Sequence, residues 1–127
     1  MSVKNLYIAS LEPNAGSLII SMGIMEMLKS RLNKIAFFRP VVMDGSILDN
    51  DIDFMRSHFN LDQKTKSCYA FTLDEVETLL SEGKEGDIIE SVLEKYHTLE
   101  AEYDFVLIQG LDQAAFAKTE RAQAFNL

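Results

Sequence analysis

The sequence predicts an α/β fold, a three-layer α/β/α arrangement with helices on both faces of a mostly parallel sheet. Two observations support this. Short apolar segments typical of buried parallel strands alternate with longer segments whose apolar residues recur at helical spacing. The chain has 127 residues, 47% of them hydrophobic and 25% charged, which is typical of one soluble domain. We therefore expect residues 1–127 to form a single domain or part of one.

The first strand, loop and helix organise the rest of the chain. Residues 5–9 are apolar and predict a strand, and residues from about 17 to 32 predict a helix. One face of this helix has apolar residues spaced four, three, three and four apart: Leu18, Met22, Met25, Leu28 and Leu32. Further apolar residues widen the face and predict a helix covered on more than one side: Ile19, Ile20, Ile24 and Met27.

The loop between this strand and helix has the form of a phosphate-binding loop, whose N–H groups converge where an anion is favoured. A strict P-loop continues from its second glycine with lysine and then serine or threonine. After Gly16 this chain has Ser17 and Leu18, so the loop keeps the shape but lacks the charge and the metal ligand. The alternative is a sharp turn in which Gly16 gives backbone freedom and Ser17 caps the helix.

Residues 35–38 predict a second buried strand that ends at Arg39 and Pro40. Strand, helix and strand make a βαβ unit with a right-handed crossover. Ligands of open α/β sheets bind beyond the carboxyl ends of the strands. We therefore expect an anionic ligand, with Arg39 as the nearby cation, beside four loop residues: Asn14, Ala15, Gly16 and Ser17.

An acidic segment, residues 49–53, begins the next predicted helix, which has Ile52, Met55 and Phe59 on one side. These acids can cap the helix and complement its dipole. Alternatively, Asp51 can offer a carboxylate to a hydrated magnesium ion, which needs few protein ligands. The two histidines, at positions 58 and 97, lack metal-ligand spacing.

The second half of the chain predicts two helices and one strand. Thr72 and Glu75 form a capping box at the start of the first helix. Residues 86–102 predict the second helix, and residues 103–108 the third strand. Asp112 follows that strand, where a Walker-B-type acid would lie and bind magnesium. The alternative is that Gly110 and Asp112 only form a turn.

Three strands are few for such a sheet, and an exposed parallel edge would remain. Residues 114–124 favour a helix with no strand after it. We infer that the chain pairs with another copy or is a piece of something longer.

Composition narrows the classes of partner and compartment. The formal net charge of −8 argues against a nucleic-acid surface and against anionic membranes. The single cysteine, Cys68, fits a reducing, cytoplasmic setting and an inert small side chain. No secretory signal is expected, and the longest apolar region, residues 18–28, is too short and interrupted to span a bilayer.

Four segments together resemble the N-terminal domain of bacterial phosphate acetyltransferase: residues 6–16, 36–41, 50–51 and 104–112. That domain is similar to dethiobiotin synthetase and to the cobyrinic acid a,c-diamide synthase group, which are P-loop proteins. The resemblance extends to about Asp112 and implies a P-loop NTPase-like fold, of which this chain is an incomplete portion.

The resemblance implies that the parent protein interconverts acetyl-CoA and phosphate with acetyl phosphate and CoA in acetate metabolism. The catalytic residues lie in a C-terminal domain absent from this chain, so the chain itself would be inactive. The N-terminal domain is associated with regulation and oligomer stability, and Ser17 and Leu18 agree with decayed phosphate machinery. In the dethiobiotin synthetase pattern the Arg39 position is usually lysine near phosphate, and the Asp51 position matches an acid that helps hold magnesium.

Three hypotheses follow. The first is a non-catalytic regulatory and assembly domain of phosphate acetyltransferase, partnered by the rest of that chain, by further copies, and by an anionic metabolite effector. The second is a synthetase of the dethiobiotin synthetase type that uses ATP and magnesium. The third is a non-enzymatic scaffold that dimerises through its incomplete sheet.

Overall fold

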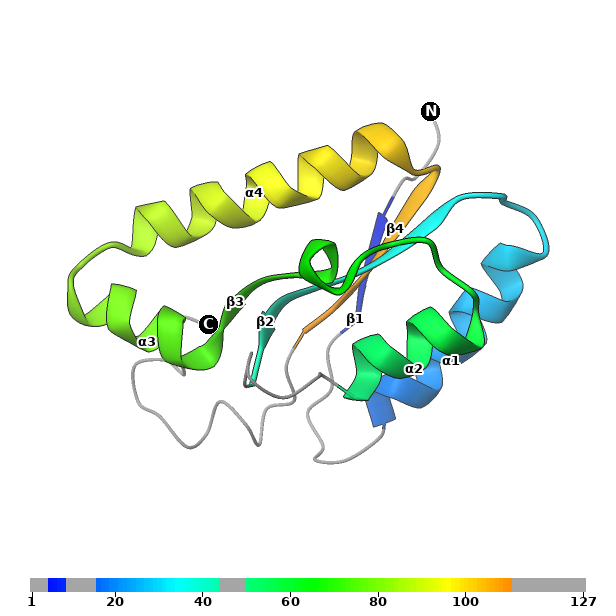
Figure 1. Cartoon of the computed structure of the whole chain (residues 1–127), viewed down its shortest axis with the longest axis horizontal. Coiled ribbons are helices and arrows are strands. Elements are labelled where there is room, and N and C mark those ends of the chain that lie inside the picture. The colour runs from blue at the N-terminus through cyan, green and yellow to red at the C-terminus, as the bar shows by residue number, and fades with distance from the viewer. Residues whose placement is uncertain (1–4, 9–15, 44–49, 111–127) are drawn as a thin grey trace.

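The computed structural model describes residues 5–8, 16–43 and 50–110 (Figure 1). Within these ranges four strands form one sheet in the order β1-β4-β2-β3, and all three pairings are parallel. The strands are β1 (Asn5–Ile8), β2 (Ile35–Val42), β3 (Tyr69–Thr72) and β4 (Phe105–Gln109). The α-helices are α1 (Gly16–Lys29), α2 (Asn50–His58), α3 (Leu73–Ser81) and α4 (Glu85–Glu102). A short 3-10 helix, Thr65–Cys68, precedes β3.

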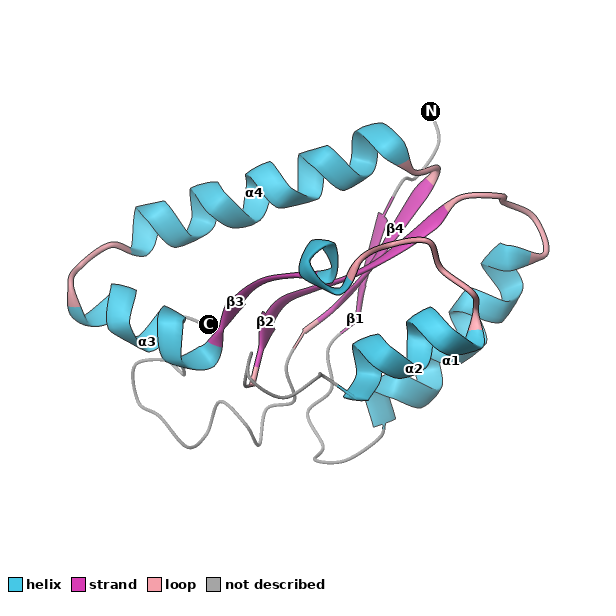
Figure 2. Cartoon of the chain, in the orientation of Figure 1, coloured by secondary structure: helices cyan, strands magenta, loops and turns pink. Residues whose placement is uncertain are grey.

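The helices lie in two layers, one on each face of the sheet (Figure 2). Helices α1 and α2 pack on one face, where the core contains Met25, Phe37 and Met55. Helices α3 and α4 cover the other face through two clusters, one around Val76 and Ile88 and one that includes Phe38, Leu99 and Val106. The three-layer α/β/α fold with a parallel sheet is therefore confirmed.

The path of the chain explains which face each helix covers. From β1 to β2 and on to β3 the chain moves across the sheet in one direction, and α1 and α2 lie on one face. From β3 back to β4 it moves in the opposite direction, and α3 and α4 lie on the opposite face (Figure 1). Both arrangements are what right-handed crossovers require.

The prediction of three strands was wrong, because β3 is a fourth. It has only four residues, all half-buried, and its short apolar segment, residues 69–71, runs directly into the capping box of the next helix. Strand β2 is also longer than expected. Its residues 35–38 pair with β4, and its pairing with β3 begins at Arg39. Pro40 thus lies inside β2, in the half that pairs only with β3, where a missing N–H interrupts no ladder with β4.

The capping box is confirmed at the start of α3. The Thr72 hydroxyl accepts a hydrogen bond from the Glu75 amide at 3.2 Å, and the Glu75 carboxylate accepts one from the Thr72 amide at 2.9 Å. Gly83 ends the helix with a φ of 72°, a conformation that favours glycine. These contacts fix the direction in which α3 leaves the end of β3.

The wide apolar surface of α1 is covered less than the sequence predicted. Met25 is fully buried, but Ile19, Ile20 and Met27 are each more than half exposed to solvent.

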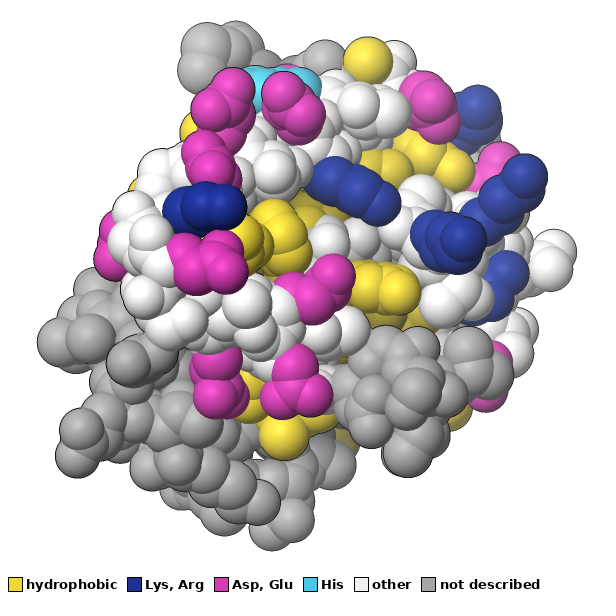
Figure 3. All heavy atoms as spheres, turned by 60° about the vertical axis from the view of Figure 1, so that its left-hand side comes forward, with side chains coloured by type: hydrophobic (Ala, Val, Ile, Leu, Met, Phe, Trp, Pro, Cys, Tyr) yellow, Lys and Arg dark blue, Asp and Glu magenta, His cyan; other side chains and the backbone are white. Residues whose placement is uncertain are grey.

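Figure 3, which brings the α3 side of the molecule forward, shows acidic and basic side chains with hydrophobic side chains exposed between them. None of the helices in the described ranges combines the length and apolar character needed to cross a membrane.

Tyr103 ties the end of α4 to the segment after α2 and yields a pH prediction. Its hydroxyl donates to the Asp62 carboxylate at 2.7 Å, and burial, with help from Asp62, raises the pKa of Tyr103. Because the folded state keeps this proton longer than the unfolded state, the stabilisation by Tyr103 should be lost as pH rises above about 10. Urea unfolding should show Tyr103→Phe less stable than the parent chain near neutral pH. The gap should narrow at alkaline pH, and a pH-independent gap would contradict this account.

Candidate functional site

Polar side chains from four elements meet at the carboxyl edge of the sheet. Strand β2 supplies Arg39, β4 supplies Gln109, α1 supplies Ser21 and α2 supplies Asp51. The first turn of α1 also lies at this edge, because the chain enters that helix soon after the end of β1 (Figure 1). In parallel α/β folds this edge is where ligands bind, so we take it as the candidate site.

Gln109 is the centre of this polar cluster. Its side-chain oxygen accepts a hydrogen bond from the Ser21 hydroxyl at 2.7 Å, and its amide nitrogen donates to Asp51 Oδ2 at 2.6 Å. Gln109 and Ser21 are fully buried, so both need partners inside the protein. The amide connects α1, β4 and α2 because it can accept on one side and donate on the other.

Arg39 is a buried cation at the same edge, with only 7% of its surface exposed. Its Nη2 donates to the Gly110 carbonyl at 3.3 Å, and its Nη1 lies 3.6 Å from Asp51 Oδ2. A single oxygen of Asp51, Oδ2, therefore accepts the hydrogen bond from the Gln109 amide and forms the ion pair with the Arg39 guanidinium. A buried arginine of this kind is held by paired charge and by backbone carbonyls.

Tyr7 and Gly110 define the edge on the β1 side. The Gly110 amide donates to the Ile8 carbonyl at 2.9 Å, which continues the pairing of β1 with β4. A Cβ on Gly110 would collide with the Tyr7 hydroxyl, so a glycine allows the phenol ring to approach the backbone. Burial raises the pKa of Tyr7, while the nearby charge of Arg39 opposes that rise.

The structure describes four of the seven site residues that the sequence predicted. Gly16 and Ser17 lie in the first turn of α1, and Arg39 and Asp51 are brought together at the sheet edge. Asn14, Ala15 and Asp112 lie outside the described residues. The anion and magnesium assignments made from the sequence therefore stay predictions.

The chemistry of the described donors can be compared with what magnesium requires. Mg²⁺ prefers octahedral oxygen ligands, usually one or two carboxylates with water and phosphate oxygens. At this edge Asp51 Oδ2 already accepts from Gln109 and faces a protein cation. In the described ranges no group of three or more His, Cys, Asp or Glu side chains is placed to hold a metal ion. Among the described side chains Asp51 is engaged by protein groups, and the assignment of magnesium to Asp51 and Asp112 stays a prediction.

Sequence reasoning missed Gln109 and Ser21. The sequence predicted Asp112 as the functional acid after β4. The structure instead places Gln109, the last residue of β4, in the cluster. One signal was available, because a glutamine that ends an apolar strand must find buried hydrogen-bond partners. Ser21 interrupts the apolar face of α1 for the same reason: it pairs with that glutamine.

A parallel sheet whose first strand leads to a helix that begins at the carboxyl edge is consistent with a P-loop-like α/β domain. The chain belongs to the AAA domain family, because the family model of that description matches residues 4–125.

Two relatives share this domain. A phosphate acetyltransferase of Nitratidesulfovibrio vulgaris is 36% identical over 111 residues, which cover 86% of this chain and 16% of that protein. A phosphate acetyltransferase of Synechocystis sp. is 28% identical over 126 residues, which cover 98% of this chain and 18% of that protein. The chain thus spans about a sixth of the length of these curated relatives. The resemblance to the N-terminal domain of phosphate acetyltransferase is confirmed.

Proposed function

We propose that this chain is a regulatory and assembly domain of a phosphate acetyltransferase and is not itself catalytic. The observation that carries the proposal is the cluster at the sheet edge, where Asp51 is held by Gln109 and Arg39. In an ATP-hydrolysing site of this fold a carboxylate at this edge would be expected to face magnesium. Position 17, where a P-loop has its phosphate-binding lysine, is a serine, which supports the same conclusion.

The regulatory half of the proposal needs a ligand, and the edge suits an anion. Helix α1 is 14 residues long and begins at this edge, so its first N–H groups favour negative charge. Arg39 adds a fixed cation between β2 and β4. We propose that a small anionic metabolite binds near residues 14–17 and is attracted by Arg39. The rest of the phosphate acetyltransferase chain and further copies of this domain would be its protein partners in the cytoplasm.

A second candidate, the ATP- and magnesium-dependent synthetase, is favoured by one observation. Arg39 is a buried cation at the carboxyl edge and could replace the missing P-loop lysine in contacting a phosphate. Arginine binds phosphate with two parallel hydrogen bonds. This candidate requires Arg39 to turn from Asp51 and Gly110 towards the ligand.

The test measures ligand-induced shifts in melting temperature together with ATP hydrolysis, on the chain of 127 residues. The panel is magnesium-ATP, acetyl-CoA, NADH, pyruvate and inorganic phosphate. We expect at least one anionic metabolite to raise the melting temperature and no hydrolysis of ATP. Hydrolysis of magnesium-ATP would overturn the non-catalytic proposal and favour the synthetase. No shift with any anion would contradict the proposed anion site.

A pair of variants locates the anion. The anion should no longer raise the melting temperature of Arg39→Met above that of the same variant without ligand. The substitution removes the buried cation and keeps a side chain of similar length. Arg31→Met is the matched control, since Arg31 is an exposed cation just beyond the other end of α1, and it should keep the shift. An equal loss in both variants would indicate nonspecific charge attraction.

A further inference from the structure

Strand β3 forms one edge of the sheet. Within the described residues it pairs with β2 on one side and with no strand on the other. Its four residues are all half-buried, so the strand reaches the surface. The outer side of an edge strand offers backbone N–H and C=O groups to a further strand. The candidate site described above does not use β3.

The two ends of β3 carry opposite charges. Lys64 and Lys66 precede the strand, and Asp74 and Glu77 follow it on α3, three residues apart and therefore on one face of that helix. Lys64, Lys66 and Asp74 are exposed. None of the four side chains forms an ion pair with another described residue. Their charges are therefore available to a partner at this edge.

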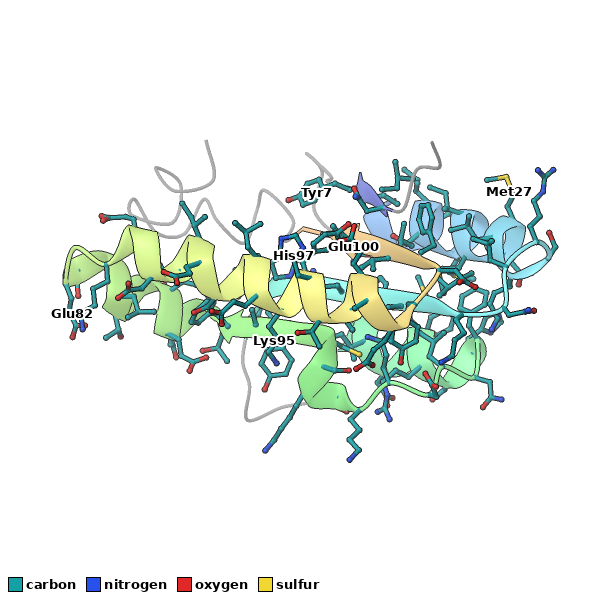
Figure 4. All side chains as sticks on the ribbon, turned by 90° about the horizontal axis from the view of Figure 1, so that it is seen from above. Tyr7, Met27, Glu82, Lys95, His97 and Glu100 are labelled. Carbon is teal, nitrogen blue, oxygen red and sulfur yellow. The ribbon has the colours of Figure 1, made fainter. Side chains whose placement is uncertain are left out.

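The basic end of β3 is held in place by α4. The Lys95 ammonium group donates to the Lys66 carbonyl at 2.7 Å, and Figure 4 shows Lys95 on the side of α4 that faces the segment before β3. Lys95 thus adds a third positive charge to this end. Most of the basic side chains visible in Figure 3 gather on one side of the view, apart from most of the acidic ones. A chain with a formal net charge of −8 therefore keeps a separate basic surface.

The order of charges along β3 specifies the partner. A second β3 in antiparallel orientation would bring its acidic end against the basic end of the first, and its basic end against the acidic one. A parallel second strand would place like charges together, which is unfavourable. Two copies related by a two-fold axis meet the requirement with one surface. An antiparallel strand at the edge of an otherwise parallel sheet is a common arrangement.

We propose that two copies of this chain pair through β3 in antiparallel orientation and form one continuous sheet. The two-fold axis passes near the middle of the strand, so residues 64–66 of one copy lie opposite the first turns of α3 in the other. The short strand limits pairing with unrelated strands, and the charges select the orientation. The interface rests on the assembly half of the proposed function and does not depend on the anion site.

The experiment is sedimentation velocity of the chain of 127 residues between about 1 and about 300 µM. We expect the parent chain to dimerise. The variant with Lys64→Glu and Lys66→Glu has two acidic ends, and its dimer dissociation constant should rise about tenfold or more. The variant with Asp74→Lys and Glu77→Lys has two basic ends and should be weakened in the same way. An equimolar mixture of the two variants should restore the dimer, because each end again meets the opposite charge.

Lys29→Glu combined with Arg31→Glu is the matched control. These exposed cations at the end of α1 are two residues apart, as Lys64 and Lys66 are. The double reversal changes the net charge of the chain by the same amount, and this control should dimerise as the parent chain does. Equal weakening in the control would assign the effect to net charge and would overturn the proposal.

Three further results would overturn the interface. A dimer that persists in both reversed variants would keep the assembly role but exclude β3 as the contact. A mixture that stays monomeric would show that the two ends of β3 do not meet. A parent chain that stays monomeric at the highest concentration would exclude the interface and contradict the assembly role as well. The anion-binding half of the proposed function is decided separately, by the shifts in melting temperature described above.

Discussion

Replacing Gln109 by glutamate is expected to lower the free energy of unfolding by about 2–4 kcal/mol at neutral pH. The substitution keeps the size of the side chain and the acceptor for the Ser21 hydroxyl. It turns the nitrogen that donates to Asp51 Oδ2 at 2.6 Å into a second carboxylate oxygen. Two like charges at that separation, one buried and one half-buried, repel each other, and a hydrogen bond is lost as well. Urea unfolding of the variant and the parent chain measures the difference.

The same variant gives a pH test with a defined sign. The repulsion should raise the pKa of the carboxylate pair in the folded state, so the folded state binds a proton that the unfolded state does not. Stability then increases relative to the parent chain as pH falls from about 7 to about 5. A pH-independent deficit would show that lost packing, not repulsion, is responsible.

A double substitution separates repulsion from other effects. Gln109→Glu combined with Asp51→Asn again pairs one carboxylate with one amide, with the roles exchanged. The double variant should recover more than half of the stability lost in Gln109→Glu. Additive losses would mean that the two side chains do not interact as the 2.6 Å distance implies.

The sequence predicted the layers of the fold because each layer leaves a local pattern. The apolar strands β2 and β4 and the helical spacing in α1 and α4 are readable within short windows. The capping box of Thr72 and Glu75 is local as well, since its two hydrogen bonds join residues three apart.

The candidate site was less predictable because its contacts are long-range. Ser21 and Gln109 are 88 residues apart in sequence, and Gln109 and Asp51 are 58 apart. The sequence placed Arg39 at the carboxyl edge through topology and offered Asp51 as a cap or a magnesium ligand, but nothing local indicated that Gln109 would lie between α1 and α2. Strand β3 was missed for a related reason, because four half-buried residues become a strand only through pairing with β2.

Gln63 shows the same limit and yields the second large prediction. Its side chain accepts from the Phe37 amide at 2.7 Å and donates to the Phe37 carbonyl at 3.1 Å. Phe37 lies in β2 before the point where β3 begins to pair, so the Gln63 amide takes the place of a neighbouring strand. The Gln63 side chain is almost fully buried. It therefore shields the Phe37 amide and carbonyl from water while it bonds to them.

Gln63→Met is therefore expected to cost about 2–4 kcal/mol, because two buried backbone groups lose their partners while volume is kept. Urea unfolding gives the total. Amide hydrogen exchange should become faster at the Phe37 amide, which loses its partner Gln63, than at its β2 neighbours Ala36 and Phe38. Ser30→Ala is the control, since it removes one exposed hydrogen bond to Met27 and should change stability by less than about 0.5 kcal/mol. If Gln63→Met matched this control, the amide would not be serving as the missing strand, and β2 would have to satisfy Phe37 in another way.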